Sequence, residues 1–258
     1  MSGSSAAADL ERLLSSWPPV EPVVPLSRNG LREVLAAALQ GGQLMIENGA
    51  NTARVEETIH RLATALGAEW CDVYVTPTGL IATVYSRGEH RTRIQRIVRS
   101  GVDLSRVAGV LAISRAAAGG ALSVAQVRER LSQVASQPRL YNRWLTTAGV
   151  GLACGCLSLL FGGGVPELAI TFVAAALAFL LREWLHQQTL SRALMTGLTA
   201  LFASALAYGL ATLAGAQFAA PAISASVLFL VPGVPMVSSI ADLFRGDTVS
   251  GVARLASA

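Results

Sequence analysis

The pattern of hydrophobic and polar positions along the chain changes near Trp144. Before this point apolar residues recur at helical or strand spacing, and after it they merge into long runs with almost no charge. A helix that spans a bilayer needs about 20 predominantly apolar residues. We therefore expect a transmembrane helical domain at 141–258 after a polar domain at 27–140, which we expect to be a cytoplasmic α+β domain on the grounds given below. Residues 1–26 are rich in Ala, Ser and Pro, and we expect a disordered tail there.

The polar half predicts two helices, three strands and two further helices. Apolar positions at 3.6-residue spacing, the capping residue Asn51, the capping box Ser123/Gln126 and alternating β-branched stretches mark them. The order predicts an α+β domain with a small antiparallel sheet. The expected elements are the helices Leu31–Asn48 and Thr52–Leu66, the strands Trp70–Thr76, Leu80–Tyr85 and Thr92–Val98, and helices from Asp103 to Ala118 and from Ser123 to about Ser136.

The second half predicts a transmembrane helical bundle of four spans. Arginines flank the first span, the loop between spans two and three, and the end of span four, whereas the other two loops contain none. Basic residues mark the cytoplasmic side, so we expect the polar half to lie in the cytoplasm. The expected spans are Trp144–Phe161, Pro166–Leu181, Ala193–Ala214 and Phe218–Ile240, and the arginines are Arg139, Arg143, Arg182, Arg192 and Arg245.

The fourth span contains the sequence Pro232-Gly-Val-Pro235. Two prolines remove backbone donors and interrupt a helix, and Gly233 adds freedom. Irregular backbone at membrane depth is tolerated where protein or a wet cavity covers it, and broken helices of transporters bind substrate in this way. A purely structural kink is the alternative. The candidate substrate pathway is Ser226, Pro232, Gly233, Pro235, Ser238, Asp242 and Arg245; Asp242 and Arg245 could form a local ion pair, a gate or a solvated pair.

Composition narrows the function further. Charged residues make up 14% of the chain, against about 25% in soluble domains. All 20 basic residues are arginine, which excludes a phosphate-binding loop that ends in Gly-Lys-Ser/Thr, a lysine Schiff base and a Ser-x-x-Lys nucleophile. The small basic surplus lies partly at the membrane boundary, so we expect no nucleic-acid partner. The three cysteines predict neither a disulfide framework nor a metal site, and we expect no cofactor.

The polar half offers little support for catalysis. His60 lies on a predicted helix beside Glu56 and Glu57, and Asp72 lies on a strand. We therefore predict no catalytic residue and no enzyme. A membrane-tethered hydrolase that uses these four residues is one alternative, and a structural or regulatory subunit of another transporter is a second.

Several motifs resemble those of the threonine/serine exporter (ThrE) family. They are Gly49-Ala-Asn-Thr-Ala-Arg-Val-Glu-Glu57 continued to Gly67, Val75-Thr-Pro-Thr-Gly79, Leu230-Val-Pro-Gly-Val-Pro235, Ala241-Asp-Leu-Phe-Arg-Gly246 and Gly251-Val-Ala-Arg254. Together they span about residues 30–258. In the polar half the residues that carry the resemblance are Glu47, Gly49, Arg54, Glu56, Thr76, Pro77 and Thr78.

The resemblance implies a bacterial inner-membrane exporter of small hydrophilic metabolites such as threonine, serine or succinate. Split members of the family divide the layout between a larger subunit (YjjP-type) and a small membrane partner subunit of about four spans (YjjB-type), and this chain resembles the larger one. Larger subunits continue into a fifth span, which Thr248–Ala258 would begin. The sequence shows no internal repeat, so we expect a hetero- or homo-oligomer.

Overall fold

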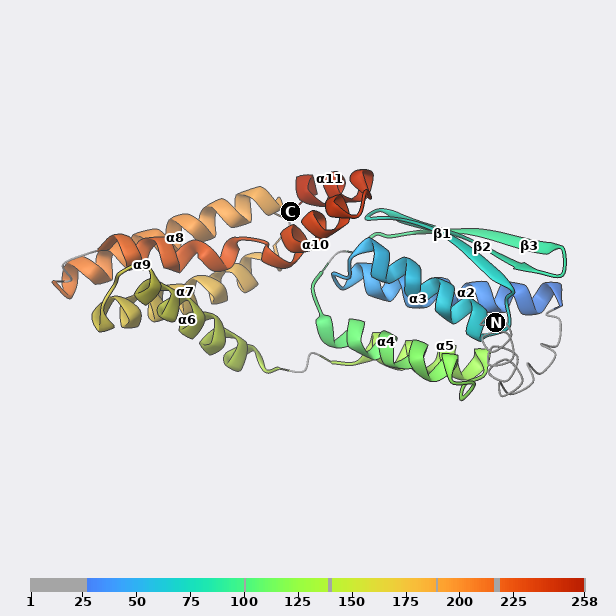
Figure 1. Ribbon diagram of the computed structural model, residues 1–258. Helices are drawn as coiled ribbons and strands as arrows, with labels where there is room; N and C mark the ends of the chain where they lie inside the picture. The colour runs from blue at the N-terminus through green and yellow to red at the C-terminus, as the bar shows by residue number, and fades with distance from the viewer. Residues whose placement is uncertain (1–26, 100, 139–140, 189, 216–218, 258) are drawn as a thin grey trace, which may run out of the picture. The chain divides into compact units, whose positions relative to one another are not determined.

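The computed structural model describes residues 27–257 except 100, 139–140, 189 and 216–218 (Figure 1). The predicted tail 1–26 and Arg139 lie outside the described residues. The described chain forms two compact units, one of residues 27–136 together with Ser238–Ser257, and the other of Gln137–Val237.

The first unit contains the predicted order of two helices, three strands and two helices. The third strand begins three residues earlier than predicted, at Glu89, and the strands pair antiparallel in the order β1-β2-β3. The elements are α2 (Arg28–Glu47), α3 (Thr52–Ala65), β1 (Trp70–Thr76), β2 (Gly79–Ser86), β3 (Glu89–Arg96), α4 (Leu104–Ala118) and α5 (Val124–Ser136).

Helices α2 and α3 form the middle layer of this unit. They cover one face of the sheet, and α4 and α5 pack on their other side. A Cβ added at Gly42 would come within 2.4 Å of the Ile59 side chain, and one at Gly41 within 2.8 Å of Leu62. These two glycines therefore allow α2 and α3 to approach closely, and α2 contributes most of its length to the core.

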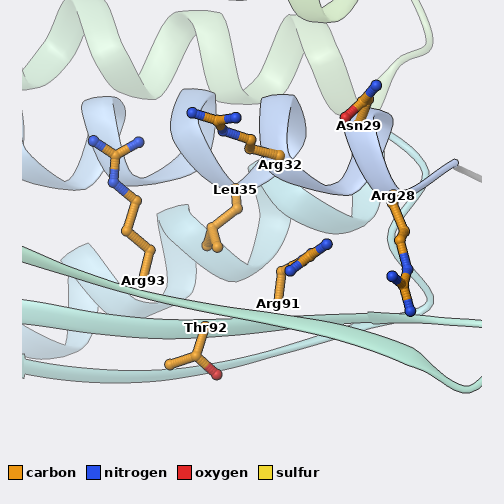
Figure 2. A pocket seen from close by; sticks show the side chains of 7 residues that line it. All are labelled: Arg28, Asn29, Arg32, Leu35, Arg91, Thr92 and Arg93. Carbon is orange, nitrogen blue, oxygen red and sulfur yellow. The ribbon is translucent and has the colours of Figure 1, made fainter.

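Strand β3 departs from the pattern of the other two strands. Arg91 pairs with the buried Val84 and Arg93 with the buried Ala82, so both arginines lie on the face of the sheet that the helices cover. Arg91 and Arg93 line a cleft together with Arg28 and Arg32 of α2 (Figure 2). The helix-facing side of the sheet is thus apolar on β1 and β2 and cationic on β3.

The C-terminal helices α10 (Gly233–Phe244) and α11 (Thr248–Ser257) form a tight hairpin. Gly246 lies between them with φ +88°, a conformation that favours glycine. A Cβ added at Gly251 would meet the Leu243 side chain at 2.6 Å, so the two helices pack closely. Residues Ser238–Ser257 belong to the first unit, where α11 packs against β1.

The second unit is a bundle of apolar helices. Three described helices are long and apolar enough to cross a membrane, and a fourth candidate is a bent pair. They match the four predicted spans. The helices are α6 (Arg143–Leu160), α7 (Val165–Leu185), α8 (Arg192–Leu213), α9 (Ala219–Val227) and the short 3-10 helix η1 (Leu228–Leu230).

Small residues form the contacts between these helices. A Cβ at Gly151 would lie 2.9 Å from the Phe172 carbonyl oxygen, and one at Gly155 would lie 3.1 Å from that of Leu168. The Gly151-x-x-x-Gly155 motif is thus a packing face of α6 against α7. Buried alanines fill the adjacent core, among them Ala174, Ala207 and Ala222.

The fourth candidate span is interrupted at Val231 and Pro232. Val231 is extended (φ −68°, ψ 124°), and the segments Ala219–Leu230 and Gly233–Phe244 are bent by 66°. Neither Pro232 nor Pro235 has a backbone N–H to donate, which explains why the helix stops and restarts here. The predicted break is confirmed.

Candidate functional site

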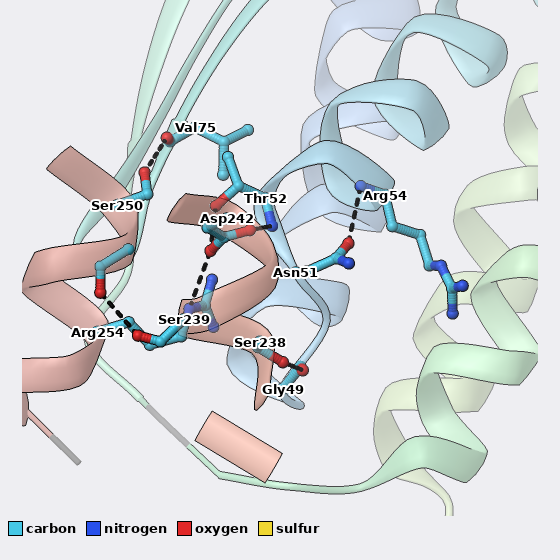
Figure 3. A network of polar contacts seen from close by, with 11 residues as sticks. Gly49, Asn51, Thr52, Arg54, Val75, Ser238, Ser239, Asp242, Ser250 and Arg254 are labelled. Carbon is cyan, nitrogen blue, oxygen red and sulfur yellow. Dashed lines mark hydrogen bonds and ion pairs between the residues drawn. The ribbon is translucent and has the colours of Figure 1, made fainter. Parts of the chain in front are cut away.

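The candidate site centres on the buried carboxylate of Asp242, near the end of α10. One carboxylate oxygen accepts the backbone N–H of Thr52 at 3.0 Å, and the other accepts the Thr52 hydroxyl at 3.0 Å. Asp242 is fully buried, and Thr52 is 1% exposed. The contact joins two of the sequence motifs, which lie 190 positions apart in the chain (Figure 3).

Asp242 completes the N-terminal cap of α3. The first N–H groups of a helix have no partner within it, and the helix dipole favours a negative charge there. Asn51 satisfies one of these groups, because its side chain accepts the Arg54 N–H at 3.0 Å. Asp242 satisfies that of Thr52, so a residue of α10 supplies a charge that α3 requires at its start.

Arg254 of α11 balances the charge of Asp242. Its Nε lies 3.3 Å from a carboxylate oxygen of Asp242, and Arg254 is 8% exposed. Removing one partner of a buried ion pair leaves the other charge without compensation, which is strongly destabilising. The pair therefore holds α10 and α11 together against the start of α3.

Three serines extend this arrangement, which we call the Asp242 joint: Thr52, Ser238, Ser239, Asp242, Ser250 and Arg254. Ser239 donates to the Gly251 carbonyl at 2.7 Å, between α10 and α11. Ser250 donates to the Val75 carbonyl of β1 at 2.9 Å, and Ser238 donates to the Gly49 carbonyl at 3.4 Å (Figure 3). The α10–α11 hairpin thus binds the turn that precedes α3, the first residue of α3 and the end of β1.

Glu56 lies beside the joint and has an unusual pKa. Burial raises the pKa of Glu56 above its ordinary value, the negative charges of Asp247 and Asp242 raise it further, and a hydrogen bond from the Val75 N–H opposes the shift. The distance from the Val75 nitrogen to Glu56 Oε1 is 3.3 Å. The first unit thus holds three carboxylates from α3, α10 and the α10–α11 turn near one another.

The predicted pathway residues separate into two groups. Pro232, Gly233 and Pro235 lie at the break, and space beside Gly233 is open. Ser226 is buried and donates to the Ile223 carbonyl of its own helix at 2.8 Å. Ser238 and Asp242 belong to the Asp242 joint.

Arg245 does not pair with Asp242. Among the described residues the ion-pair partner of Asp242 is Arg254, and Arg245 is exposed. The local Asp242–Arg245 ion pair suggested by their spacing is therefore wrong, because Asp242 turns into the protein toward α3 and α11.

The remaining motif residues of the polar half have local roles. Glu47 accepts a hydrogen bond from Gln43 at 2.8 Å, and the Arg54 side chain is exposed. The hydroxyl of Thr76 accepts the Gly79 N–H at 3.1 Å and closes the turn through Pro77 and Thr78. Of this set, Gly49 contacts the Asp242 joint, and Glu56 lies beside it.

Sequence reasoning missed Thr52, Ser250 and Arg254. Each lay within a motif but carried no local signal of its partner. The sequence holds only a partial signal: 248–258 contains Arg254 and no acidic residue, so any carboxylate partner of Arg254 must come from elsewhere in the chain, but the sequence shows neither its burial nor which carboxylate it meets.

The residues considered for hydrolysis have structural partners. His60 Nδ1 lies 2.8 Å from the Cys71 carbonyl oxygen, and its ring packs edge-on against Trp70. Asp72 accepts the Trp70 indole N–H at 2.7 Å. Burial and the nearby Asp72 raise the pKa of the Cys71 thiol to about 12, so Cys71 is not a thiolate nucleophile at neutral pH.

The chain has several helices that could cross a membrane, one of them broken at a Pro-Gly-Val-Pro sequence, and it also has a compact α+β unit. This combination defines a multi-pass membrane protein of the transporter class. The chain matches the family described as "Putative threonine/serine exporter" (ThrE) over residues 36–258. The protein therefore belongs to the ThrE family.

Named relatives agree with this assignment. The chain is 34% identical over 229 residues to the "Probable succinate transporter subunit YjjP" of Escherichia coli (strain K12), with 88% of each chain covered. It is 27% identical over 237 residues to the "Probable threonine/serine exporter" of Mycobacterium tuberculosis, with 88% of this chain and 43% of that protein covered. No solved structure matches the chain. The family and these names indicate a membrane exporter and not an enzyme.

Proposed function

We propose that this chain is the larger subunit of a two-component secondary exporter in the bacterial inner membrane. Its substrate is a small hydrophilic metabolite, either threonine or serine or a dicarboxylate such as succinate. The names of the relatives support both substrate classes, since one relative is named a succinate transporter subunit and another a threonine/serine exporter.

The observation that carries this proposal is the broken helix. Two prolines and an extended Val231 interrupt an apolar stretch, and the backbone groups freed there are suited to a polar solute. Helix α10 restarts at Gly233, so its N-terminal N–H groups and dipole would attract a substrate carboxylate. We assign Ser226, Pro232, Gly233 and Pro235 to the substrate pathway, with Arg245 at its cytoplasmic mouth.

Ser238 and Asp242 take a different part in this proposal. Both are engaged in protein contacts, and Asp242 is fully buried. We therefore assign them the positioning of α10, the helix that continues from the break into the Asp242 joint. A change at the joint would reach the break along one continuous helix.

The placement of arginines supports a cytoplasmic first unit. Arg143 begins α6, Arg182 lies in the last turn of α7, and Arg192 begins α8. If these three successive helices each cross the bilayer, the three arginines share one side, which basic residues mark as cytoplasmic. The polar residues that precede α6 would lie on that side.

A partner subunit completes the proposed exporter. Transporters with alternating access are usually built from repeated halves, and this chain has no internal repeat. The word "subunit" in the names of YjjP relatives supports a second component. We propose a small membrane protein of about four spans (YjjB-type), which a short apolar reading frame beside this one would encode.

Reconstitution tests the proposal. Proteoliposomes that contain this chain and the partner are preloaded with labelled threonine, serine or succinate, and efflux is followed with and without a proton gradient. We expect efflux of at least one substrate well above that of empty vesicles and of vesicles with either subunit alone. Efflux equal to that of empty vesicles for all three substrates would contradict the proposal.

A further inference from the structure

A cationic cleft lies between α2 and β3, within the first unit and away from the Asp242 joint. Its volume is about 450 Å³. Arg28 and Arg32 of α2 line it, and so do Arg91 and Arg93 of β3 (Figure 2). Asn29, Leu35 and Thr92 complete the lining, so the cleft has a cationic rather than an apolar character.

Core packing does not explain the arginines of β3. On the face of the sheet that the helices cover, β1 and β2 contribute buried apolar residues, and the β3 partners of Ala82 and Val84 are arginines. The apolar Ile94 of β3 instead points to the opposite face, where it is 70% exposed. Strand β3 thus places arginines on the helix-facing side of the sheet and an apolar residue on the opposite side, which is the reverse of the pattern that core packing favours.

The four guanidinium groups carry more positive charge than their surroundings balance. Glu89 pairs with Arg28 through two contacts of 3.0 and 3.1 Å, and this hydrogen-bonded arginine lowers the pKa of Glu89. The side chains of Arg32, Arg91 and Arg93 form no hydrogen bond or ion pair with the described part of the chain. Arg28 and Arg32 also stand four apart on one helix, a spacing at which like charges destabilise.

We propose that this cleft binds a polyanion through its phosphate groups. Guanidinium groups present planar, bidentate donors that match phosphate oxygens, and several of them side by side favour a ligand with several negative charges. No aromatic side chain of the described residues lines the cleft, so they offer a nucleobase no stacking surface and the phosphates carry the recognition. The phosphate comes from a soluble polyphosphate or from the headgroup of an anionic lipid.

Protection of the sheet edge is the competing explanation. Inward-pointing charges on an edge strand prevent strands of different molecules from pairing. That role accounts for Arg91 and Arg93, and the ion pair with Glu89 accounts for Arg28, but neither gives a reason for Arg32 on the facing helix. Edge protection predicts that the cleft binds no phosphate compound.

Calorimetry on the full-length protein in phosphatidylcholine nanodiscs tests the proposal with inorganic tripolyphosphate. We expect Arg32→Gln with Arg93→Gln to weaken the Kd at least tenfold with no fall in Tm, and Arg91→Gln alone to weaken the Kd less. The control Arg128→Gln with Arg130→Gln removes two exposed arginines of α5 and should leave the Kd unchanged. No binding to the wild type, equal binding to both double variants, or equally tight binding of succinate would each overturn the proposal.

A second arm identifies the source of the phosphate. Nanodiscs that contain phosphatidylglycerol are compared with phosphatidylcholine alone. If a lipid headgroup is the ligand, it competes and weakens the apparent Kd for tripolyphosphate; if a soluble polyphosphate is the ligand, the Kd does not change. Formation of dimers by the Arg32/Arg93 variant, without any tripolyphosphate binding by the wild type, would establish edge protection instead and refute the site.

Discussion

The carboxylate of Asp242 receives both the backbone N–H and the hydroxyl of Thr52, each at 3.0 Å. Asp242 lies near the end of α10, the helix that restarts after the break, and Thr52 is the first residue of α3. Because both hydrogen bonds are buried and α3 requires an acceptor at its N-terminus, this contact fixes the end of α10.

Substitution of Asp242 by asparagine should release the hairpin. Asparagine keeps an oxygen for the Thr52 N–H, but it removes the charge opposite the buried Arg254. We expect a loss of about 3 kcal/mol in the stability of this contact. Hydrogen exchange on the full-length protein should show faster exchange in 238–257 and at the start of α3.

Arg245→Gln is the matched control for this change. It alters a charge three residues further along the chain, just past the end of α10, but Arg245 is exposed and forms none of the contacts of the joint. We expect its exchange pattern to equal that of the wild type. Equal protection of 238–257 in Asp242→Asn and wild type would show that the charge pair does not hold the hairpin.

Glu56 should make the stability of the first unit depend on pH. Because its pKa is raised in the folded protein, the native state binds this proton more tightly than the unfolded chain does. Stability from this group is therefore lost as pH rises above the ordinary glutamate value of 4.5. Glu56→Gln keeps the acceptor for the Val75 N–H and removes the charge, so we expect a higher Tm than wild type at neutral pH.

The measurement is Tm of wild type and variant from about pH 4 to about pH 8. The difference should grow with pH and vanish at the acid end. Glu57→Gln serves as the control, since Glu57 is exposed and pairs with Arg61. A difference in Tm that stays constant across the range would argue against a raised pKa at Glu56.

Gly151→Ala should disrupt the packing of α6 on α7. The added methyl group would lie 2.9 Å from the Phe172 carbonyl oxygen, which belongs to the backbone and cannot move aside cheaply. We expect a loss of about 2 kcal/mol, measured as a lower Tm in detergent. Gly149→Ala, on the same helix with open space around the new methyl group, should not lower Tm.

Helix and strand positions could be predicted because their signals are local. Asn51, Asp103 and the Ser123/Gln126 pair cap the helices that their spacing indicated. The start of β3 was misplaced because its sequence Glu89-His-Arg lacks the β-branched and apolar residues that mark a strand. The Arg28–Glu89 ion pair and the pairing with β2 place these residues in the sheet.

The break in the fourth span was visible in the sequence, whereas the Asp242 joint was not. Pro232 and Pro235 interrupt a helix in any context, so their effect follows from covalent structure. The partners of Asp242 come from 190 positions earlier and from the following helix, and spacing alone suggested Arg245. Tertiary packing selected Arg254, which no local rule indicates.

The most direct test of the account is efflux by a protein whose break has been removed. Pro232→Ala with Pro235→Ala restores two backbone donors and allows a continuous helix. In Pro166→Ala, the control, the proline lies in the first turn of α7, where it interrupts nothing. With the partner subunit in proteoliposomes, we expect efflux by the double variant to fall at least tenfold at equal insertion, and Pro166→Ala to match the wild type. Equal efflux by the double variant and the wild type would contradict the claim that the substrate crosses at the break.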